Sequence, residues 1–392
     1  MLGPAFGDRL DALLAADDAE RAARYPGPDV SRQPVHTCYV PADRFGTHTR
    51  DEWRAGAIAA LDEHGPLPGV DDELEQRVRD KLADEPVEDL RVDFEDGYGH
   101  RSDDDEDTAA RAAGEALGRG PRTAFLGIRM KSLEASTRRR GMRTLDLVLE
   151  SLLAFGSLPR GFRVTLPRVT SVAQVEAMVE LCAALESTYS LSRLPFELQI
   201  EMPQAVLGAD GTALVARMLH ASAGRCVGLH YGTYDYSAAL GVAAAWQSLA
   251  HPVADHAKDV LQVAAAQTRV PVCDGSSNVL PVGGREAVRA AWTMHAGLVR
   301  RSLERGIYQG WDLHPAQLPT RFAATFAFYR EGAGAAAARL RAYLDRQDSG
   351  IADEPATARA LAGYLLLGHA CGALDEADLA GFAVATLVEL TR

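Results

Sequence analysis

The stretch "RVDFEDGYGH" (residues 91–100) ends a short β-type run with three carboxylates, and two glycines stand close behind them. The carboxylates are those of Asp93, Glu95 and Asp96. An ionised carboxylate that loses its water needs a counter-charge. The pattern of the segments before and after this stretch predicts the fold, and the fold predicts where these carboxylates lie.

Short apolar runs recur along the chain, and most are followed by a segment of helical period. This alternation is typical of parallel strands joined by crossover helices. The chain holds eight such runs, which predicts a (β/α)8, or TIM, barrel. The expected strands lie within "VHTCYVPA" (35–42), "DLRVDFED" (89–96), "AFLGIRMK" (124–131), "FRVTLPRV" (162–169), "FELQIEMP" (196–203), "RCVGLHYG" (225–232), "RVPVCDG" (269–275) and "IYQGWDLHP" (307–315).

The segments between these runs carry helix signals. In "SVAQVEAMVELCAALEST" (171–188), Val172, Val175 and Val179 recur at spacings of three and four, and Ser171 can cap the first turn. The acidic run "SDDDED" (102–107) predicts either a solvated loop or the start of the next helix, where negative charge suits the helix dipole.

The two ends of the chain fall outside the barrel pattern. We predict an N-terminal helical segment (1–33), a barrel catalytic domain (34–320) and a C-terminal helical cap (321–392), with "DSGIADEP" (348–355) as a break between helices. The tail is rich in apolar residues, so we expect it to pack on its own barrel or on a neighbouring copy, and we expect a homo-oligomer.

Bulk composition limits the classes of partner. The chain of 392 residues has 54 acidic against 41 basic residues, which argues against nucleic acid as a partner. Its five cysteines are scattered without a CxxC pair, so we expect neither a disulfide framework nor a zinc knuckle. We therefore expect a cytoplasmic location. Neither a signal peptide nor a long apolar run is evident, so we expect no membrane association.

Charged residues fall where the predicted strands end, which is where barrels of this kind place their active sites. Glu201 interrupts the apolar run "LQIEMPQ" (198–204), and Asp235 follows the next predicted strand. Two carboxylates with open positions for water and substrate are typical of a Mg²⁺ site. Taken singly, either residue is as readily a helix cap or an ion-pair partner.

Arg129, at the end of the third predicted strand, allows two interpretations. It can simply neutralise the acidic cluster of the second strand. Beside a metal, its permanent charge can instead stabilise an enolate or carbonyl oxygen.

Eight short strings resemble, in order, the strand signatures of the HpcH/HpaI aldolase and citrate lyase β-subunit superfamily, whose barrel malate synthase shares. The resemblance covers roughly residues 34–320. The strings are "YVPADRF" (39–45), "DFEDGYG" (93–99), "GIRMKSL" (127–133), "TLPRV" (165–169), "IEMPQAV" (200–206), "GLHYGTYDYSAALG" (228–241), "CDG" (273–275) and "GWDLHPAQL" (310–318).

The resemblance implies a Mg²⁺- or Mn²⁺-dependent carbon–carbon lyase or aldolase. Such an enzyme acts through an enolate on a small 2-oxo acid, a hydroxy acid or its coenzyme A thioester, and its relatives often form trimers or hexamers. By position in the matching strings, the implied site comprises Glu201 and Asp235 as metal ligands, Arg129 as the enolate-stabilising arginine, Glu95 and Asp96 as an acidic pair that holds metal-bound water or takes part in proton transfer, and the backbone of Gly232, Thr233 and Tyr234 as the segment that binds the substrate carboxylate.

Two other functions stay open at this point. One is a malate-synthase-like condensation of an acyl-CoA with glyoxylate. The other is a non-catalytic barrel that serves as a binding or regulatory module.

Overall fold

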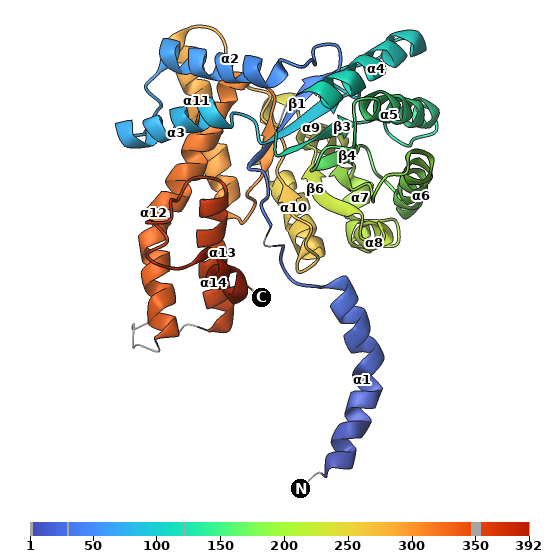
Figure 1. Cartoon of the computed structure of the whole chain (residues 1–392), viewed down its shortest axis with the longest axis vertical. Coiled ribbons are helices and arrows are strands. Elements are labelled where there is room, and N and C mark those ends of the chain that lie inside the picture. The colour runs from blue at the N-terminus through green and yellow to red at the C-terminus, as the bar shows by residue number, and fades with distance from the viewer. Residues whose placement is uncertain (1–2, 30, 121–122, 346–353, 392) are drawn as a thin grey trace.

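The eight predicted runs form one barrel. The structure, a computed structural model, describes residues 3–29, 31–120, 123–345 and 354–391. Its eight strands pair in parallel in the order β7-β6-β5-β4-β3-β2-β1-β8, and a bridge between Cys273 and Gln309 brings the two edges together. The predicted (β/α)8 barrel with additional helices at both ends is therefore confirmed (Figure 1).

Every strand lies within its predicted run and is largely buried, as expected for a parallel sheet covered by helices. The strands are β1 (His36–Pro41), β2 (Asp89–Asp93), β3 (Phe125–Arg129), β4 (Phe162–Leu166), β5 (Phe196–Ile200), β6 (Cys226–Tyr231), β7 (Val272–Cys273) and β8 (Gly310–Asp312).

Helices follow the strands and cover the barrel. Ser171 caps α6 by accepting a hydrogen bond from the Gln174 backbone, and Ser102 caps α4, so the acidic run after Ser102 is the first turn of a helix. The helices are α1 (Pro4–Arg24), α2 (Thr49–His64), α3 (Asp72–Asp84), α4 (Asp103–Arg119), α5 (Arg138–Leu153), α6 (Val172–Tyr189), α7 (Pro203–Val206), α8 (Leu214–Ala221), α9 (Thr233–Ala239), η1 (Ala244–Trp246), α10 (Pro252–Ala265), α11 (Arg285–Glu304), η2 (Pro315–Gln317), α12 (Leu318–Leu344), α13 (Pro355–Ala370) and α14 (Val384–Leu390).

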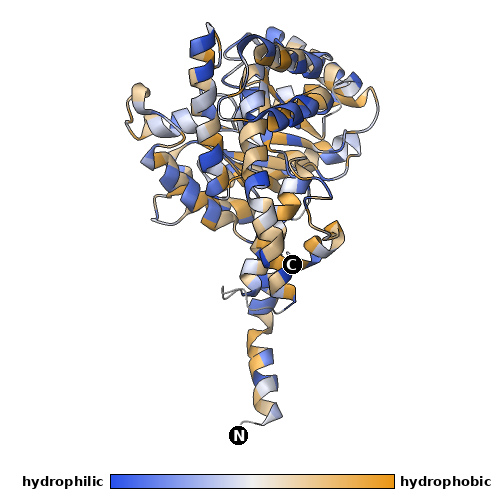
Figure 2. Ribbon diagram, turned by 90° about the vertical axis from the view of Figure 1, so that its left-hand side faces the viewer, coloured by the Kyte–Doolittle hydropathy of each residue, from blue (hydrophilic) through white to orange (hydrophobic). Residues whose placement is uncertain are grey.

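The N-terminal helix α1 projects from the rest of the molecule in both views (Figures 1 and 2). None of its residues is buried, and Leu13 is 74% exposed. Within the described residues, no helix combines the length and the apolar character that crossing a membrane requires.

The C-terminal helices share one hydrophobic core with the barrel helices α2, α3 and α11. Leu365 of α13 is fully buried in this core together with Phe322 and Phe326 of α12. Helix α12 begins at Leu318 and runs across residue 320, so the boundary between barrel and cap stays a prediction. Most of the predicted break "DSGIADEP" lies outside the described residues. The homo-oligomer also stays a prediction.

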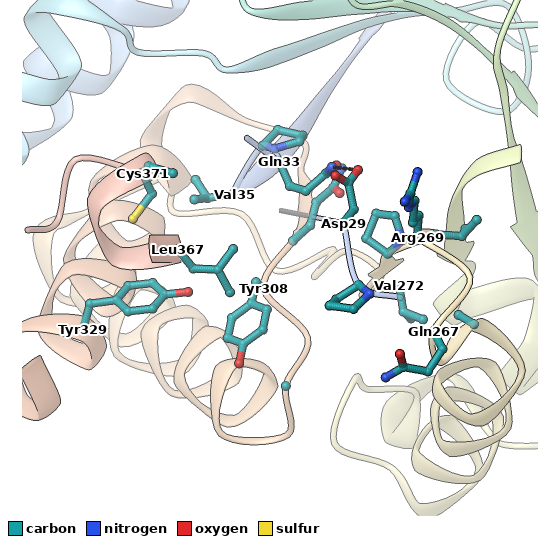
Figure 3. Close-up of a pocket in the computed structure, with 18 residues that line it drawn as sticks. Asp29, Gln33, Val35, Gln267, Arg269, Val272, Tyr308, Tyr329, Leu367 and Cys371 are labelled. Atoms are coloured by element: carbon teal, nitrogen blue, oxygen red, sulfur yellow. Dashed lines mark hydrogen bonds between the residues drawn. The ribbon is translucent and has the colours of Figure 1, made fainter. Parts of the chain in front are cut away.

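A cavity of about 300 Å³ lies between the C-terminal helices and the N-terminal ends of β7, β8 and β1 (Figure 3). Its lining is mostly apolar and includes Leu367 and Tyr329. The carboxylate of Asp29, at its edge, accepts a hydrogen bond from Gln33. This end of the barrel is opposite to the strand ends that carry the predicted site residues.

We expect Leu365→Ala to lower the free energy of unfolding by about 2–4 kcal/mol, because it leaves a cavity in a fully buried core. Leu13→Ala, a matched change on exposed α1, should alter it by less than about 0.5 kcal/mol. Urea unfolding measures both. Equal effects of the two substitutions would contradict the shared core.

Candidate metal and catalytic site

The sequence-predicted site residues come together at the C-terminal ends of the strands. A cavity of about 380 Å³ opens there. The predicted residues that line it are Asp96, Arg129, Glu201, Gly232, Thr233, Tyr234 and Asp235. Glu95 lines an adjoining cavity of about 470 Å³, which Asp96 also borders.

Asp93 and Arg129 form a buried ion pair at this end of the barrel. The register of β2 on β3 sets the two residues side by side. The Arg129 Nε and Nη2 atoms donate to the two Asp93 carboxylate oxygens, each at 2.7 Å. Burial alone would raise the pKa of Asp93, but the charge and hydrogen bonds of Arg129 outweigh it and lower that pKa.

The loop after β2 is shaped around the same carboxylate. The backbone N–H groups of Glu95 and Gly97 donate to Asp93 at 2.9 and 2.8 Å. A Cβ atom at Gly97 would lie 2.5 Å from an Asp93 oxygen, so a glycine is required for this close approach. The first carboxylate of "DFEDG" therefore organises the loop that presents the other two.

Glu201, Asp235 and Asp96 form a second group. One carboxylate oxygen from each lies within 4.8 Å of the others. Glu201 is 1% exposed, and its two oxygens accept hydrogen bonds from the backbone N–H of Arg168 at 2.7 Å and from Gln199 Nε2 at 2.5 Å.

Burial and mutual repulsion disfavour the ionised forms of these carboxyl groups in the absence of a cation. Burial, with the negative charge of Asp235, raises the pKa of Glu201 to about 7. Burial, with the charges of Glu201 and Asp96, raises the pKa of Glu95 to about 8. In both cases the charge of Arg129 lowers the pKa by less than burial and the neighbouring carboxylates raise it.

We define the carboxylate cluster as Asp93, Glu95, Asp96, Glu201 and Asp235. Among the described residues, the ion pairs to these five carboxylates involve two guanidinium groups. Arg129 pairs with Asp93 and, at 3.4 Å, with Glu95. Arg168 lies 3.4 Å from Asp235 and 3.9 Å from Glu95. The cluster therefore carries excess negative charge.

The donor set fits a hard divalent cation. Carboxylate oxygens are the ligands that Mg²⁺ and Mn²⁺ prefer. A Cβ atom at Gly232 would lie 2.4 Å from the Glu201 Cβ and 2.7 Å from its Oε2, so the glycine leaves the space in which this carboxylate stands. Glu201 and Asp235 lie together as the sequence predicts, and Asp96 joins them as a third candidate ligand.

The segment Gly232–Tyr234 leads from β6 into α9. The Gly232 N–H donates to the Ile200 carbonyl at 3.0 Å. Thr233 and Tyr234 stand in the first turn of α9, where backbone N–H groups have no partner within the helix. The Tyr234 hydroxyl accepts a hydrogen bond from the Asn278 backbone at 2.6 Å, which ties this segment to the loop after β7.

Sequence reasoning did not assign roles to Gln199 and Arg168. Gln199 stands two positions before Glu201, so strand alternation places both side chains on one face. It donates a hydrogen bond to Glu201 and accepts one from Arg129 at 3.2 Å.

Two aromatic residues of the site, Tyr39 and Trp311, were also not predicted. Their rings lie 4.6 Å apart, and the Arg129 guanidinium lies 4.9 Å from the Tyr39 ring.

In metal-free buffer we expect the free energy of unfolding to fall as the pH rises from about 5 to about 8. The pKa values of Glu201 and Glu95 are raised from 4.5 to about 7 and about 8, so over this range the folded protein binds more protons than the unfolded chain. Glu201→Gln should flatten this dependence and raise the Tm at about pH 8 by about 2 °C or more.

Thermal unfolding in EDTA, followed by circular dichroism across this pH range, measures the effect. Glu150→Gln removes an exposed carboxylate of α5 and is the matched control. A Glu201→Gln curve with the wild-type slope would show that repulsion in the cluster does not limit stability.

The structure of this chain is similar to those of several solved proteins. No curated protein matches the sequence. A citrate lyase from Burkholderia xenovorans LB400 has a similar structure, with 19% identity, a TM-score of 0.61 and coverage of 90% of this chain and 96% of that one. CitE from Mycobacterium tuberculosis, solved in complex with magnesium, acetoacetate and coenzyme A, has 18% identity, a TM-score of 0.51 and coverage of 88% and 100%.

A Haloferax volcanii malate synthase, solved as a magnesium and glyoxylate complex, has 13% identity and a TM-score of 0.49, with coverage of 91% of this chain and 97% of that one. The fold of this chain is similar to that of the citrate lyase and of CitE. The family described as "Domain of unknown function (DUF6986)" matches residues 14–392, and the chain belongs to that family.

Proposed function

We propose that this protein is a Mg²⁺-dependent carbon–carbon lyase or aldolase, with Mn²⁺ as an alternative ion. Its substrate would be a small 2-oxo acid, a hydroxy acid or its coenzyme A thioester, converted through an enolate. The observation that carries the proposal is the group formed by Asp96, Glu201 and Asp235 beside Arg129 in one cavity. The magnesium and coenzyme A complex of M. tuberculosis CitE, on a similar fold, supports it.

Glu201, Asp235 and Asp96 are the residues that would hold the cation. When bound, a divalent cation supplies a Lewis acid that polarises carboxylate and carbonyl oxygens. Gln199 and the Arg168 backbone N–H each donate to one of the two Glu201 oxygens and so fix the orientation of this carboxylate.

Arg129 would stabilise the negative charge that develops on the enolate oxygen. Asp93 fixes its Nε and Nη2, so the guanidinium plane is oriented before substrate arrives. A donor that is already oriented does not need to reorganise as the charge develops, which is the condition for electrostatic catalysis.

The remaining predicted residues have supporting roles in the proposal. The N–H groups of Thr233 and Tyr234, with the space beside Gly232, would receive the substrate carboxylate. Glu95 would act with Asp96 on bound water or in proton transfer. An assay of thiol release from acetyl-CoA with glyoxylate distinguishes the lyase or aldolase reaction from the malate-synthase-like condensation.

The test is deuterium exchange at the methyl group of pyruvate in D₂O, followed by NMR. We expect exchange that requires Mg²⁺ and that Glu201→Gln abolishes together with Mg²⁺ binding, because a neutral amide is a much weaker ligand for a hard ion. Thiol release from acetyl-CoA plus glyoxylate would favour the condensation instead. Absence of both exchange and cleavage of 2-oxo, hydroxy-acid or thioester substrates would refute the lyase assignment.

Arg129→Lys should lower the rate of exchange by about 10²-fold or more, because the ammonium keeps the charge but loses the planar donor set. Its Mg²⁺ affinity, measured by calorimetry, should remain close to wild type. Arg111→Lys, a matched change in an exposed pair with Glu150, should leave both quantities unaltered. Full activity of Arg129→Lys would assign Arg129 a structural role only.

A further inference from the structure

Arg168 has an unusual backbone conformation for its residue type. It follows β4 and Pro167, and its φ is 54°, in the left-handed region that L residues with a side chain rarely adopt. Such conformations persist where surrounding contacts hold them, and they concentrate at functional sites.

This conformation gives Arg168 two contacts with the carboxylate cluster. Its backbone N–H donates to Glu201 Oε1 at 2.7 Å. Its Nη1 lies 3.4 Å from Asp235 Oδ1 and 3.9 Å from Glu95 Oε1. The same residue therefore orients one candidate metal ligand through its backbone and neutralises another through its side chain.

These two contacts have opposite consequences for a bound cation. The N–H positions Glu201 without adding a full charge. The guanidinium, in contrast, occupies an oxygen of Asp235 and would repel a divalent ion held by that carboxylate, since repulsion between such charges a few ångströms apart is strong.

A second carboxylate, that of Glu134, lies close to the Arg168 side chain. The Arg168 side chain is 31% exposed, and its Nε already lies 3.5 Å from Glu134, whose side chain is 44% exposed. Arg168 also borders the adjoining cavity that Glu95 and Glu134 line. Movement toward Glu134 would release Asp235 and keep the guanidinium paired.

We propose that Arg168 is the resident counter-ion of the carboxylate cluster and that a divalent cation must displace its guanidinium from Asp235 in order to bind. This proposal rests on the proposed function, because it assigns a positioning residue to the same metal site. Arg168 thereby lowers the affinity for the free cation, and the displaced guanidinium at the cavity edge becomes available to an anionic substrate. Metal and substrate would then bind cooperatively, each raising the affinity of the other.

The structure suggests a variant that separates the two contacts. Arg168→Gly removes the guanidinium but retains the backbone N–H, and glycine adopts a positive φ without steric cost. Arg168→Gln removes the charge while keeping a polar side chain, and it decides the matter if the glycine variant fails to fold. Arg101→Gln is the control, because Arg101 is an exposed arginine that lines the adjoining cavity and pairs with Asp43.

Calorimetric titration of EDTA-treated protein with Mg²⁺ alone, without substrate, tests the proposal. We expect Arg168→Gly and Arg168→Gln to bind Mg²⁺ about tenfold more tightly than wild type, and Arg101→Gln to match wild type within about twofold. If wild type binds Mg²⁺ and both Arg168 variants bind it equally or more weakly, this inference is overturned while the proposed metal site is retained. No binding by wild type or by any variant would overturn both.

Discussion

Repulsion among carboxylates at the barrel mouth is the constraint on which the site depends. Five of them approach from the ends of β2 and β5 and from the start of α9, and among the described residues their ion pairs involve two guanidinium groups. Burial is the largest cause of the raised pKa values of Glu201 and Glu95, and the neighbouring carboxylates raise them further. The requirement for glycine at positions 97 and 232 follows, because both leave room for the carboxylates.

The barrel interior just below the mouth offers an internal comparison. There Arg91 is fully buried and pairs with Asp89 at 2.6 Å and with Glu197 at 2.9 Å. Arg163 adds a second guanidinium to Glu197, so two arginines face two carboxylates. Among the described residues, these two guanidinium groups match the two carboxylates in number, whereas the five carboxylates at the mouth form ion pairs with two guanidinium groups. The contrast separates a structural ion-pair network from a candidate metal site within one molecule.

Much of this arrangement could be predicted from the sequence, because parallel strands converge at their C-terminal ends. Once eight runs are recognised, Glu201 and Asp235 must lie on one side of the mouth, as they do. The conformation of individual loop residues could not be predicted. The left-handed backbone of Arg168 and the approach of Asp96 to Glu201 depend on contacts between loops that are distant in sequence. The shared core of the C-terminal helices and the barrel helices could not be predicted either, because it depends on how these helices pack.

Anomalous diffraction from crystals soaked with Mn²⁺ and oxalate tests the central claim most directly. Manganese replaces magnesium at oxygen-ligand sites, and its anomalous scattering distinguishes the ion from water and from lighter atoms. The account predicts one strong peak at about 2.0–2.3 Å from carboxylate oxygens of Glu201 and Asp235, with Asp96 beside it and Arg168 withdrawn from Asp235. A map with no peak at the mouth, or with the peak elsewhere and Arg168 still paired with Asp235, would contradict it.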